Sequence, residues 1–581
     1  MKATMRGCHA IHSLRSILPC AIAALATTAC AVRIAPATGT PTGSAYDVVI
    51  ENGRIVDGTG NAWFYGDVAI SGNRIARVAP FGALATAPAK RRIDARGLVV
   101  APGFIDIQSH SWDAVLWRDG RVVGKVTQGV TTEILGEATT PAPINANMLA
   151  LLELPDTLPK LVALHKTFGG DHGFGAWLDA IGRHGNSVNV GSYLGAATVR
   201  AYAKGQTQGP ATAAELDTMR AVVRHAMEDG AFGLSSALIY PPGSYATTIE
   251  LIESAKAMSP YHGAYITHIR SEDDQLFEAM DEAFRIAREG NVSLDIYHLK
   301  ASGRNNWPKA AGMIAKIDSA RTAGIDVGAT MYPYAASANG LASCFPDWVA
   351  ENGKLLPNLR DSATRARVVA EMTKSGSCDP ERSSAIAIVG YKKAELKKYE
   401  GWRLDQVMKD MNRSAPDAVI ELTLAENNQL GKINFSMNEA NVAMQLKRPW
   451  VVIGSDAGGQ DPDSATGLTH PRAYGTFARV LGKYVRTDGL LTLEDAVRKM
   501  TSATAARLKL RDRGLLREGM YADVVVFDAA TIIDKATFER PHQLSVGVKY
   551  VFVNGVAVVS DGKHTGAKPG MVVRGPGWTG R

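Results

Sequence analysis

The chain has 581 residues, of which 46% are hydrophobic. It can therefore bury a large core, but it is too long for one domain of ordinary size, and we expect two or three structural units. Its 64 Lys and Arg against 57 Asp and Glu give a net charge of +7. These charges are spread along the chain without a basic block, which argues against a nucleic-acid partner.

The first predicted element is an export signal. A basic start is followed by an apolar stretch over residues 16–26 and by small residues around Cys30. This pattern is typical of a signal peptide over residues 1–31 and is too short for a transmembrane span, so we expect a periplasmic or secreted protein. The alternative is a lipoprotein with a lipid anchor at Cys30, although a threonine three positions earlier fits that motif poorly. Removal of the signal leaves Cys344 and Cys378, for which a disulfide and two free thiols are both open.

Short β-rich segments stand at both ends of the remaining chain. A linker rich in Pro, Gly and Thr covers residues 32–45, and residues 46–97 carry the Asn-Gly, Asp-Gly and Gly-Asn pairs that are typical of hairpins. Short β-rich segments of the same kind recur over residues 508–575. We therefore expect one small β-sandwich built from both chain ends.

Residues 98–507 alternate apolar runs with helical stretches such as Ala213–Glu228 and Gln275–Glu289. This alternation indicates βα units and a parallel sheet, and eight strands close a (β/α)8 TIM-like barrel of the α/β class. The interval before the last strand is longer than one helix requires, which predicts an insertion over the barrel mouth at about residues 338–445. The predicted strands are Leu98–Ile107, Thr132–Leu135, Val188–Leu194, Phe232–Ile239, Ala264–Thr267, Val292–Tyr297, Val327–Met331 and Trp450–Gly454.

Three histidines and one aspartate stand at the C-terminal ends of these apolar runs: His110, His268, His298 and Asp456. Because the carboxyl ends of barrel strands meet at one mouth, side chains far apart in sequence can share a metal there. We predict that His268 and His298 are two metal ligands and that Glu137, after the second strand, is the third. The alternative for each histidine is a hydrogen-bonded position in the core.

Asp456 is the predicted proton shuttle. A carboxylate beside a metal can take the proton of the attacking water as general base and later deliver it to the leaving nitrogen as general acid. The alternative is a carboxylate that only caps the following loop, Ala-Gly-Gly-Gln-Asp-Pro-Asp.

An ordered set of motifs runs along the chain: Ala-Pro-Gly-Phe-Ile-Asp with Ser-His, Lys-Val-Thr-Gln-Gly-Val-Thr-Thr, Gly-Leu-Ser-Ser-Ala-Leu-Ile-Tyr-Pro-Pro, Thr-His-Ile-Arg, Tyr-His-Leu-Lys, Gly-Ser-Asp and His-Pro-Arg. With these motifs the chain resembles the D-aminoacylase (N-acyl-D-amino-acid deacylase) branch of the amidohydrolase superfamily over residues 46–560. The resemblance implies a barrel with a sandwich. It also implies zinc-dependent hydrolysis of N-acyl-D-amino acids to a carboxylate and a free D-amino acid.

The resemblance also assigns residues. His268 and His298 match the histidines of the tightly held zinc, and Asp456 matches the catalytic aspartate. Arg472 matches the arginine that grips the substrate carboxylate, a task suited to a planar guanidinium; its alternative is a role in fixing a loop. The other positions matched to the substrate pocket are Tyr240, Lys300 and, more weakly, Tyr332.

The chain departs from the family pattern at two positions. Gln108 stands where D-aminoacylases carry the first histidine of His-x-His, and an amide oxygen is a poor zinc ligand, so we expect the second metal position to be weak or empty. The family often has a cysteine after the second strand, where this chain has Glu137. The resemblance therefore implies one zinc on His268, His298 and Glu137. His110 lies near Asp456, either as a residual ligand or as a hydrogen-bond donor.

Two other functions are kept open. One is the same chemistry on another amide, either a cyclic imide or ureide or an N-acyl-L-amino acid. The other is a non-catalytic barrel that binds acylated amino acids. The glutamine at position 108 in place of a metal-binding histidine favours it, whereas Asp456, which a binding protein would not need, argues against it. Both concern a small-molecule partner, and the sequence does not indicate the side-chain preference or the oligomeric state.

Overall fold

The computed structural model describes residues 45–152, 159–374, 378 and 382–580. The predicted signal peptide, the alternative lipid anchor at Cys30 and almost all of the predicted linker precede residue 45 and lie outside the described residues. Within the described ranges, no helix has both the length and the apolar character needed to cross a bilayer.

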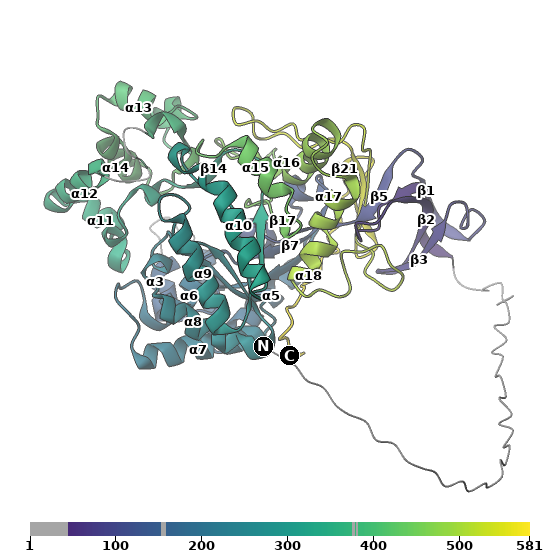
Figure 1. The fold of residues 1–581 in the computed structure, drawn as a ribbon, viewed down its shortest axis with the longest axis horizontal. Coiled ribbons are helices and arrows are strands. Elements are labelled where there is room, and N and C mark those ends of the chain that lie inside the picture. Colours follow the sequence, from purple (N-terminus) through teal and green to yellow (C-terminus); the bar gives the residue numbers. More distant parts are fainter. Residues whose placement is uncertain (1–44, 153–158, 375–377, 379–381, 581) are drawn as a thin grey trace, which may run out of the picture. The chain divides into compact units, whose positions relative to one another are not determined.

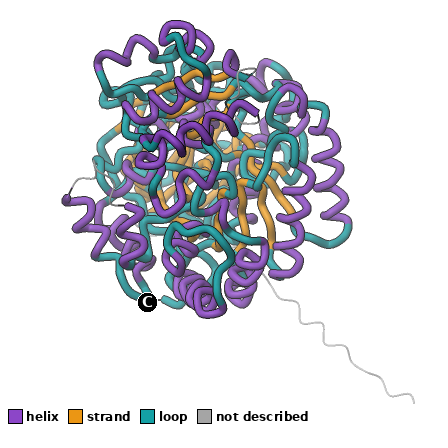
Figure 2. The backbone as a smooth tube through the Cα atoms, turned by 90° about the vertical axis from the view of Figure 1, so that its left-hand side faces the viewer, coloured by secondary structure: helices purple, strands orange, loops and turns teal. Residues whose placement is uncertain are grey.

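Eight parallel strands with helices around them form the barrel, and Figure 2 shows the strands inside the helical layer. The hydrogen-bonded order is β6-β7-β8, then β9-β10-β11-β12-β13-β17, and a parallel bridge between Ser109 and Ala457 joins the ends of β6 and β17. The predicted α/β barrel is confirmed. Its strands are β6 (Phe104–Asp106), β7 (Val130–Leu135), β8 (Asn189–Ser192) continued by β9 (Leu194–Gly195), β10 (Gly233–Ala237), β11 (Ala264–His268), β12 (Ser293–Ile296), β13 (Val327–Met331) and β17 (Val451–Ile453).

The predicted first strand, Leu98–Ile107, is two strands. Residues Val99–Pro102 form β5, which pairs with the terminal sheet, and only β6 belongs to the barrel. The change of partner occurs at Gly103, where an added Cβ would lie 2.3 Å from the side chain of Thr131. The close approach of two backbones requires glycine there. A continuous apolar run cannot reveal this exchange, because both halves are buried.

Amphipathic helices cover the barrel. The predicted helices over 213–228 and 275–289 are present as α7 and α9, and α7 begins with a capping box between Thr212 and Glu215. The helices are α1 (Trp112–Leu116), α2 (Val123–Val126), α3 (Ala146–Leu152), α4 (Pro159–Lys166), α5 (Gly173–His184), α6 (Ala196–Lys204), α7 (Ala213–Glu228), α8 (Thr248–Met258), α9 (Leu276–Gly290), α10 (Lys309–Thr322), α15 (Glu439–Leu446), α16 (Arg472–Arg479), α17 (Leu493–Met500) and α18 (Ser502–Arg507).

Strands from both chain ends form one nine-stranded sheet in the described part of the chain, shown at one end of Figure 1. β5 joins the two halves, because it pairs with β1 on one side and β18 on the other. Residues beyond 565 leave this sheet, and Val572 bridges to Val190 of the barrel. The remaining strands are β1 (Tyr46–Ile55), β2 (Phe64–Ser71), β3 (Arg74–Pro80), β4 (Ala89–Asp94), β18 (Val524–Phe527), β19 (Val548–Val553), β20 (Val556–Ser560) and β21 (Lys563–His564).

The insertion between β13 and β17 has a hydrophobic core of its own, which includes Val349, Val368, Leu404 and Val419. Cys344 and Cys378 are joined by a disulfide within it. Helix α15, which the sequence places inside the insertion, instead packs against barrel strands β13 and β17. The elements of the insertion are β14 (Ser337–Gly340), α11 (Leu355–Arg360), α12 (Ser362–Lys374), β15 (Ile386–Val389), α13 (Leu404–Met411), α14 (Ala415–Ala425) and β16 (Gly431–Asn434).

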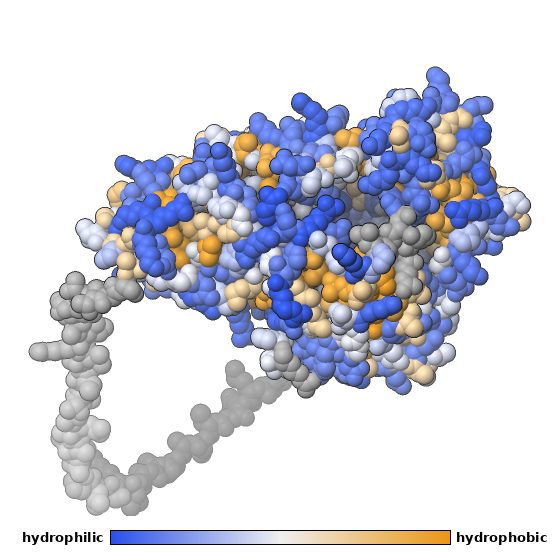
Figure 3. All heavy atoms as spheres, turned by 180° about the vertical axis from the view of Figure 1, so that it is seen from behind, coloured by the Kyte–Doolittle hydropathy of each residue, from blue (hydrophilic) through white to orange (hydrophobic). Residues whose placement is uncertain are grey.

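The surface is mostly hydrophilic on the face shown in Figure 3, where hydrophobic residues form small, separate patches. Among the described residues, the buried hydrophobic side chains form cores mainly in the barrel, the terminal sheet and the insertion. These cores hold the strand ends in place, and the polar cluster described below sits on those ends.

Candidate metal centre and active site

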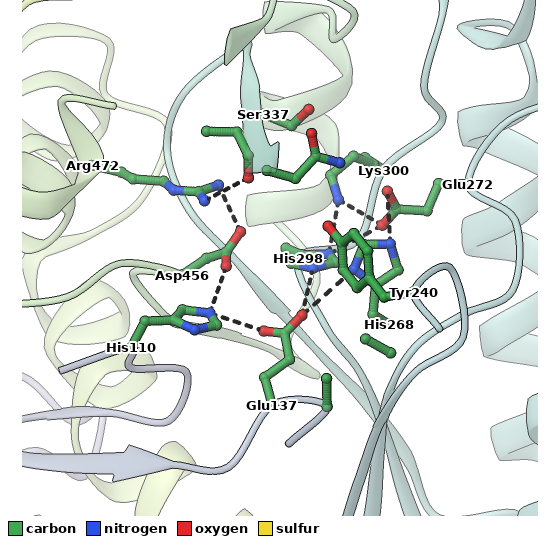
Figure 4. A pocket seen from close by; sticks show the side chains of 14 residues that line it. His110, Glu137, Tyr240, His268, Glu272, His298, Lys300, Ser337, Asp456 and Arg472 are labelled. Carbon is green, nitrogen blue, oxygen red and sulfur yellow. Dashed lines mark hydrogen bonds and ion pairs between the residues drawn. The ribbon is translucent and has the colours of Figure 1, made fainter. Parts of the chain in front are cut away.

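All of the predicted site residues except Tyr332 meet in one cavity of about 280 Å³ at the C-terminal ends of the barrel strands. His110, Glu137 and Asp456 follow β6, β7 and β17, and His268 ends β11. Figure 4 shows their side chains pointing toward one another. The lining residues are His110, Glu137, Ala138, Ala237, Tyr240, His268, Glu272, His298, Lys300, Ser337, Ala338, Asn339, Asp456 and Arg472.

Glu137, His268 and His298 are buried and lie close enough together that they could hold one metal ion. Glu137 Oε1 lies 3.5 Å from His268 Nδ1 and 3.4 Å from His298 Nε2. Zinc bonds of about 2.0–2.2 Å at tetrahedral angles place neighbouring donor atoms about 3.3–3.6 Å apart, so the spacing fits zinc. Burial by itself raises the pKa of Glu137, but hydrogen bonds to its histidine partners hold this pKa well below its usual range. Glu137 is therefore ionised and can serve as an anionic donor.

His110 lies between two carboxylates. Its Nε2 is 3.3 Å from Glu137 Oε2 and 3.0 Å from Asp456 Oδ1. Burial by itself lowers the pKa of His110, whereas its hydrogen bonds to Asp456 and Glu137 raise this pKa to about 9. The three residues are a second group of metal-ligating type that shares Glu137 with the first.

Gln108 is fully engaged by protein partners at both ends of its amide. Its Nε2 donates to Glu137 Oε2 at 2.7 Å, and its Oε1 accepts from Thr330 Oγ1 at 2.8 Å. The nitrogen end faces Glu137, and the oxygen end is turned away toward Thr330. Gln108 therefore occupies a lone pair of Glu137 and offers no oxygen to a second metal.

Asp456 is held from two sides. Its Oδ2 lies 2.6 Å from Arg472 Nη1, and its Oδ1 faces His110. Burial by itself raises the pKa of Asp456, but the charges of Arg472 and His298 and the hydrogen bond from His110 lower it overall. Asp456 is thus ionised at neutral pH and ready to accept a proton.

Two of these residues adopt strained backbone conformations. His298 has φ = 34° and Asp456 has φ = 52°, in the left-handed region that non-glycine residues rarely enter. Such positions cost about 1–3 kcal/mol each and cluster at functional sites. The geometry of both side chains is therefore fixed at a cost in stability.

Glu272 is a site residue that the sequence-based prediction missed. Its carboxylate lies 3.5 Å from His268 Nε2 and 3.1 Å from His298 Nδ1. These contacts leave the other nitrogen of each ring facing Glu137, which is how a carboxylate behind a ligating histidine fixes the ring. The only available signal is the spacing of four residues from His268 in Thr-His-Ile-Arg-Ser-Glu.

The four predicted substrate contacts divide into two groups. Lys300 and Tyr240 line the cavity, and the ammonium of Lys300 is 2.6 Å from Glu272 Oε1. Arg472 also lines the cavity and donates to Ala338 O at 3.2 Å, while its Nε has no hydrogen-bond partner among the described residues. Tyr332 does not line this cavity; its ring lies 4.7 Å from the guanidinium of Arg472 and supports it.

A buried ionic cluster lies beside the strand ends that carry the site. Lys125 Nζ is 2.5 Å from Asp106 Oδ2 and 3.1 Å from Glu133 Oε1, and all three side chains are fully buried. Asp106 also accepts from the backbone N–H of Ser455, the residue before Asp456. The cluster ties β6 and β7 to the loop that carries Asp456.

Lys125→Met is expected to lower the free energy of unfolding by about 3–5 kcal/mol, because it leaves two buried carboxylates without their cation. Thermal and denaturant unfolding would measure the loss. The exposed Lys549→Met serves as the matched control and should change stability by less than about 0.5 kcal/mol. Equal stability of both variants would show that Asp106 and Glu133 are compensated without Lys125.

Comparison with known proteins decides the family. A sequence profile described as "Amidohydrolase family" matches residues 404–559. A D-aminoacylase of Alcaligenes xylosoxydans xylosoxydans is 35% identical over 533 residues, which cover 91% of this chain and 97% of that protein. The chain belongs to the D-aminoacylase family of amidohydrolases. The family resemblance predicted from the motifs is confirmed.

Solved structures of D-aminoacylase family members have the same fold. One D-aminoacylase, with a binuclear metal centre activated by one metal and attenuated by the second, superposes with a TM-score of 0.74 at 33% identity, covering 91% of this chain and 100% of that one. The N-acyl-D-glutamate deacylase of Bordetella bronchiseptica, solved with zinc and a phosphonate mimic of the tetrahedral intermediate, gives 0.74 at 31% identity with the same coverage.

Proposed function

We propose that this D-aminoacylase family member is a zinc-dependent hydrolase of N-acyl-D-amino acids, which yields a carboxylate and a free D-amino acid. The observation that carries the proposal is the buried donor set of Glu137, His268 and His298 with Asp456 and Arg472 in the same cavity. Family members named D-aminoacylase and N-acyl-D-glutamate deacylase support the substrate class. Release of free amine from N-acetyl-D-amino acids by zinc-loaded protein tests it.

The ligand set would hold zinc, which supplies Lewis-acid chemistry by polarising the amide carbonyl and lowering the pKa of the attacking water. Asp456 accepts the proton of that water at Oδ1, the oxygen that faces His110 rather than Arg472. It then delivers the proton to the amide nitrogen as the C–N bond breaks. His110 donates to Oδ1 and orients the carboxylate. Arg472 binds the α-carboxylate of the substrate through its remaining donors.

We propose further that one zinc ion is sufficient and that the second metal position is weak or empty. The two hydrogen bonds of the Gln108 amide support this, because they satisfy both of its ends within the protein. His110 then acts as a hydrogen-bond donor and not as a ligand, which is the choice that the sequence leaves open.

Purified protein equilibrated with excess zinc is expected to hold one zinc per chain and to keep its activity. Gln108→His should raise the stoichiometry toward two, because an imidazole replaces an amide beside the shared Glu137. Elemental analysis and activity against zinc concentration would measure both effects. Two tightly held zinc ions in the unaltered protein would overturn the one-metal proposal.

We also propose export to the periplasm or medium, supported by the signal-like sequence over residues 1–31 and by the disulfide between Cys344 and Cys378. Mass spectrometry of the native protein tests this. A chain that starts after residue 31 supports the signal peptide, and a lipid-bearing chain that starts at Cys30 supports the lipoprotein. An unprocessed chain in the cytoplasm contradicts both.

A further inference from the structure

A second cavity of about 710 Å³ lies between the barrel loops and the insertion. It shares four lining residues with the metal cavity: His268, Glu272, Ser337 and Asn339. The two cavities therefore adjoin, and a substrate whose amide lies at the metal centre can extend a substituent into the second one.

One face of the three-stranded sheet of the insertion lines this second cavity. In the antiparallel pair of β14 and β16, Ser337 lies opposite Asn434 and Asn339 lies opposite Lys432. These four side chains alternate with apolar neighbours, so they project from one face, and all four line the cavity. The sheet thus carries a polar strip that starts at the metal cavity and leads away from it.

Lys432 ends this strip and is connected to the metal cavity by one intervening side chain. Its Nζ donates to Asn434 Oδ1 at 3.3 Å, and Asn434 Nδ2 donates to Asn339 Oδ1 at 3.3 Å. Asn339 lines both cavities. Two hydrogen bonds through the amide of Asn434 therefore connect the ammonium of Lys432 to a residue of the metal cavity.

Lys432 is 2% exposed, and among the described residues no carboxylate lies within ion-pair distance of its ammonium. Burial and the charge of Arg382 lower its pKa to about 7. A buried cation without a counter-ion costs free energy that an incoming anion recovers. Arg382 lines the same cavity, where its guanidinium lies 3.7 Å from the carboxylate of Asp273.

We propose that this cavity binds the side-chain carboxylate of an N-acyl-D-amino acid with an acidic side chain, N-acyl-D-glutamate or N-acyl-D-aspartate, and that Lys432 is its specificity-determining residue. The inference rests on the proposed function. Arg472 takes the α-carboxylate beside Asp456, and Lys432 takes the second carboxylate beyond Ser337 and Asn339. A neutral side chain in this cavity leaves the ammonium of Lys432 without a partner, which is how a polar site rejects a substrate that lacks the matching group.

The test compares N-acetyl-D-glutamate with N-acetyl-D-glutamine, which differ only in the charge of the side chain. The zinc-loaded enzyme is expected to prefer the glutamate substrate by at least about tenfold in kcat/KM. Lys432→Met should lower this preference by about 10- to 100-fold, chiefly through the glutamate substrate, because each tenfold is about 1.4 kcal/mol of lost interaction. Turnover of the glutamine substrate should stay within about threefold, which also shows that the variant is folded.

Lys397→Met is the matched control, because Lys397 is an exposed lysine of the insertion that lines neither cavity. It should keep the preference of the unaltered enzyme. An unaltered enzyme that prefers the glutamine substrate, or an unchanged preference in Lys432→Met, would overturn the inference. A preference for N-succinyl over N-acetyl substrates that depends on Lys432 would also overturn it, since the cavity would then hold the acyl group. Absence of turnover on every N-acyl-D-amino acid contradicts the proposed function instead.

Discussion

Glu137→Ala is expected to abolish tight zinc binding and to lower kcat/KM by more than about 10³. Glu137 supplies the only anionic donor of the set, and its Oε1 lies within 3.5 Å of a nitrogen from each of two histidines. Without it, two imidazoles remain, too few to hold a zinc ion firmly. Zinc content after dialysis and steady-state kinetics on an N-acetyl-D-amino acid would measure the two losses together.

Glu137→Cys is the informative control for that variant. A thiolate is a strong zinc ligand, and the D-aminoacylase family often has a cysteine at the place of Glu137. This variant should therefore retain about one zinc per chain. If Glu137→Ala keeps one zinc and normal activity, the metal lies elsewhere and the ligand assignment is wrong.

Asp456→Asn is expected to lower kcat by about 10²–10⁴ while zinc content stays unchanged. Asparagine keeps the shape of the side chain and can still face His110, but it cannot accept the proton of water. The pair with Arg472 holds the carboxylate ionised in the unaltered enzyme. The variant therefore separates loss of proton transfer from loss of metal.

Asp463→Asn provides the comparison for Asp456→Asn. Asp463 is an exposed aspartate a few residues further along the same loop and lines neither of the two cavities. It should behave as the unaltered enzyme in both kcat and zinc content. An Asp456→Asn enzyme with near-normal kcat would show that another group carries the proton.

The sequence predicts the parts of the site that follow from barrel geometry. His268, His298 and Asp456 end apolar strands, and the carboxyl ends of barrel strands always meet, so their convergence needs no coordinates. Glu272 escapes the same reasoning because it lies in a loop four residues beyond a strand end. Its contact with both histidines depends on how that loop turns.

Burial and strand partnership are harder to obtain from sequence. Lys432 stands between Gly431 and Ile433 in the sequence, and only the packing of the insertion buries its side chain. The run Leu98–Ile107 is apolar throughout, so its exchange of partners at Gly103 leaves no trace in the pattern. Helix α15 follows the insertion directly in the sequence, and its contacts with β13 and β17 depend on the closed barrel.

The most direct test of the central claim is release of free amine by the zinc-loaded protein from matched N-acetyl-D- and N-acetyl-L-amino acids. The account predicts turnover of the D series, including N-acetyl-D-glutamate, with little or none of the L series, and loss of that turnover in Asp456→Asn. Turnover of the L series or of cyclic ureides alone would contradict the substrate assignment. If the protein holds one zinc but turns over none of these amides, it is not an amide hydrolase. The remaining function is then a barrel that binds acylated amino acids without cleaving them.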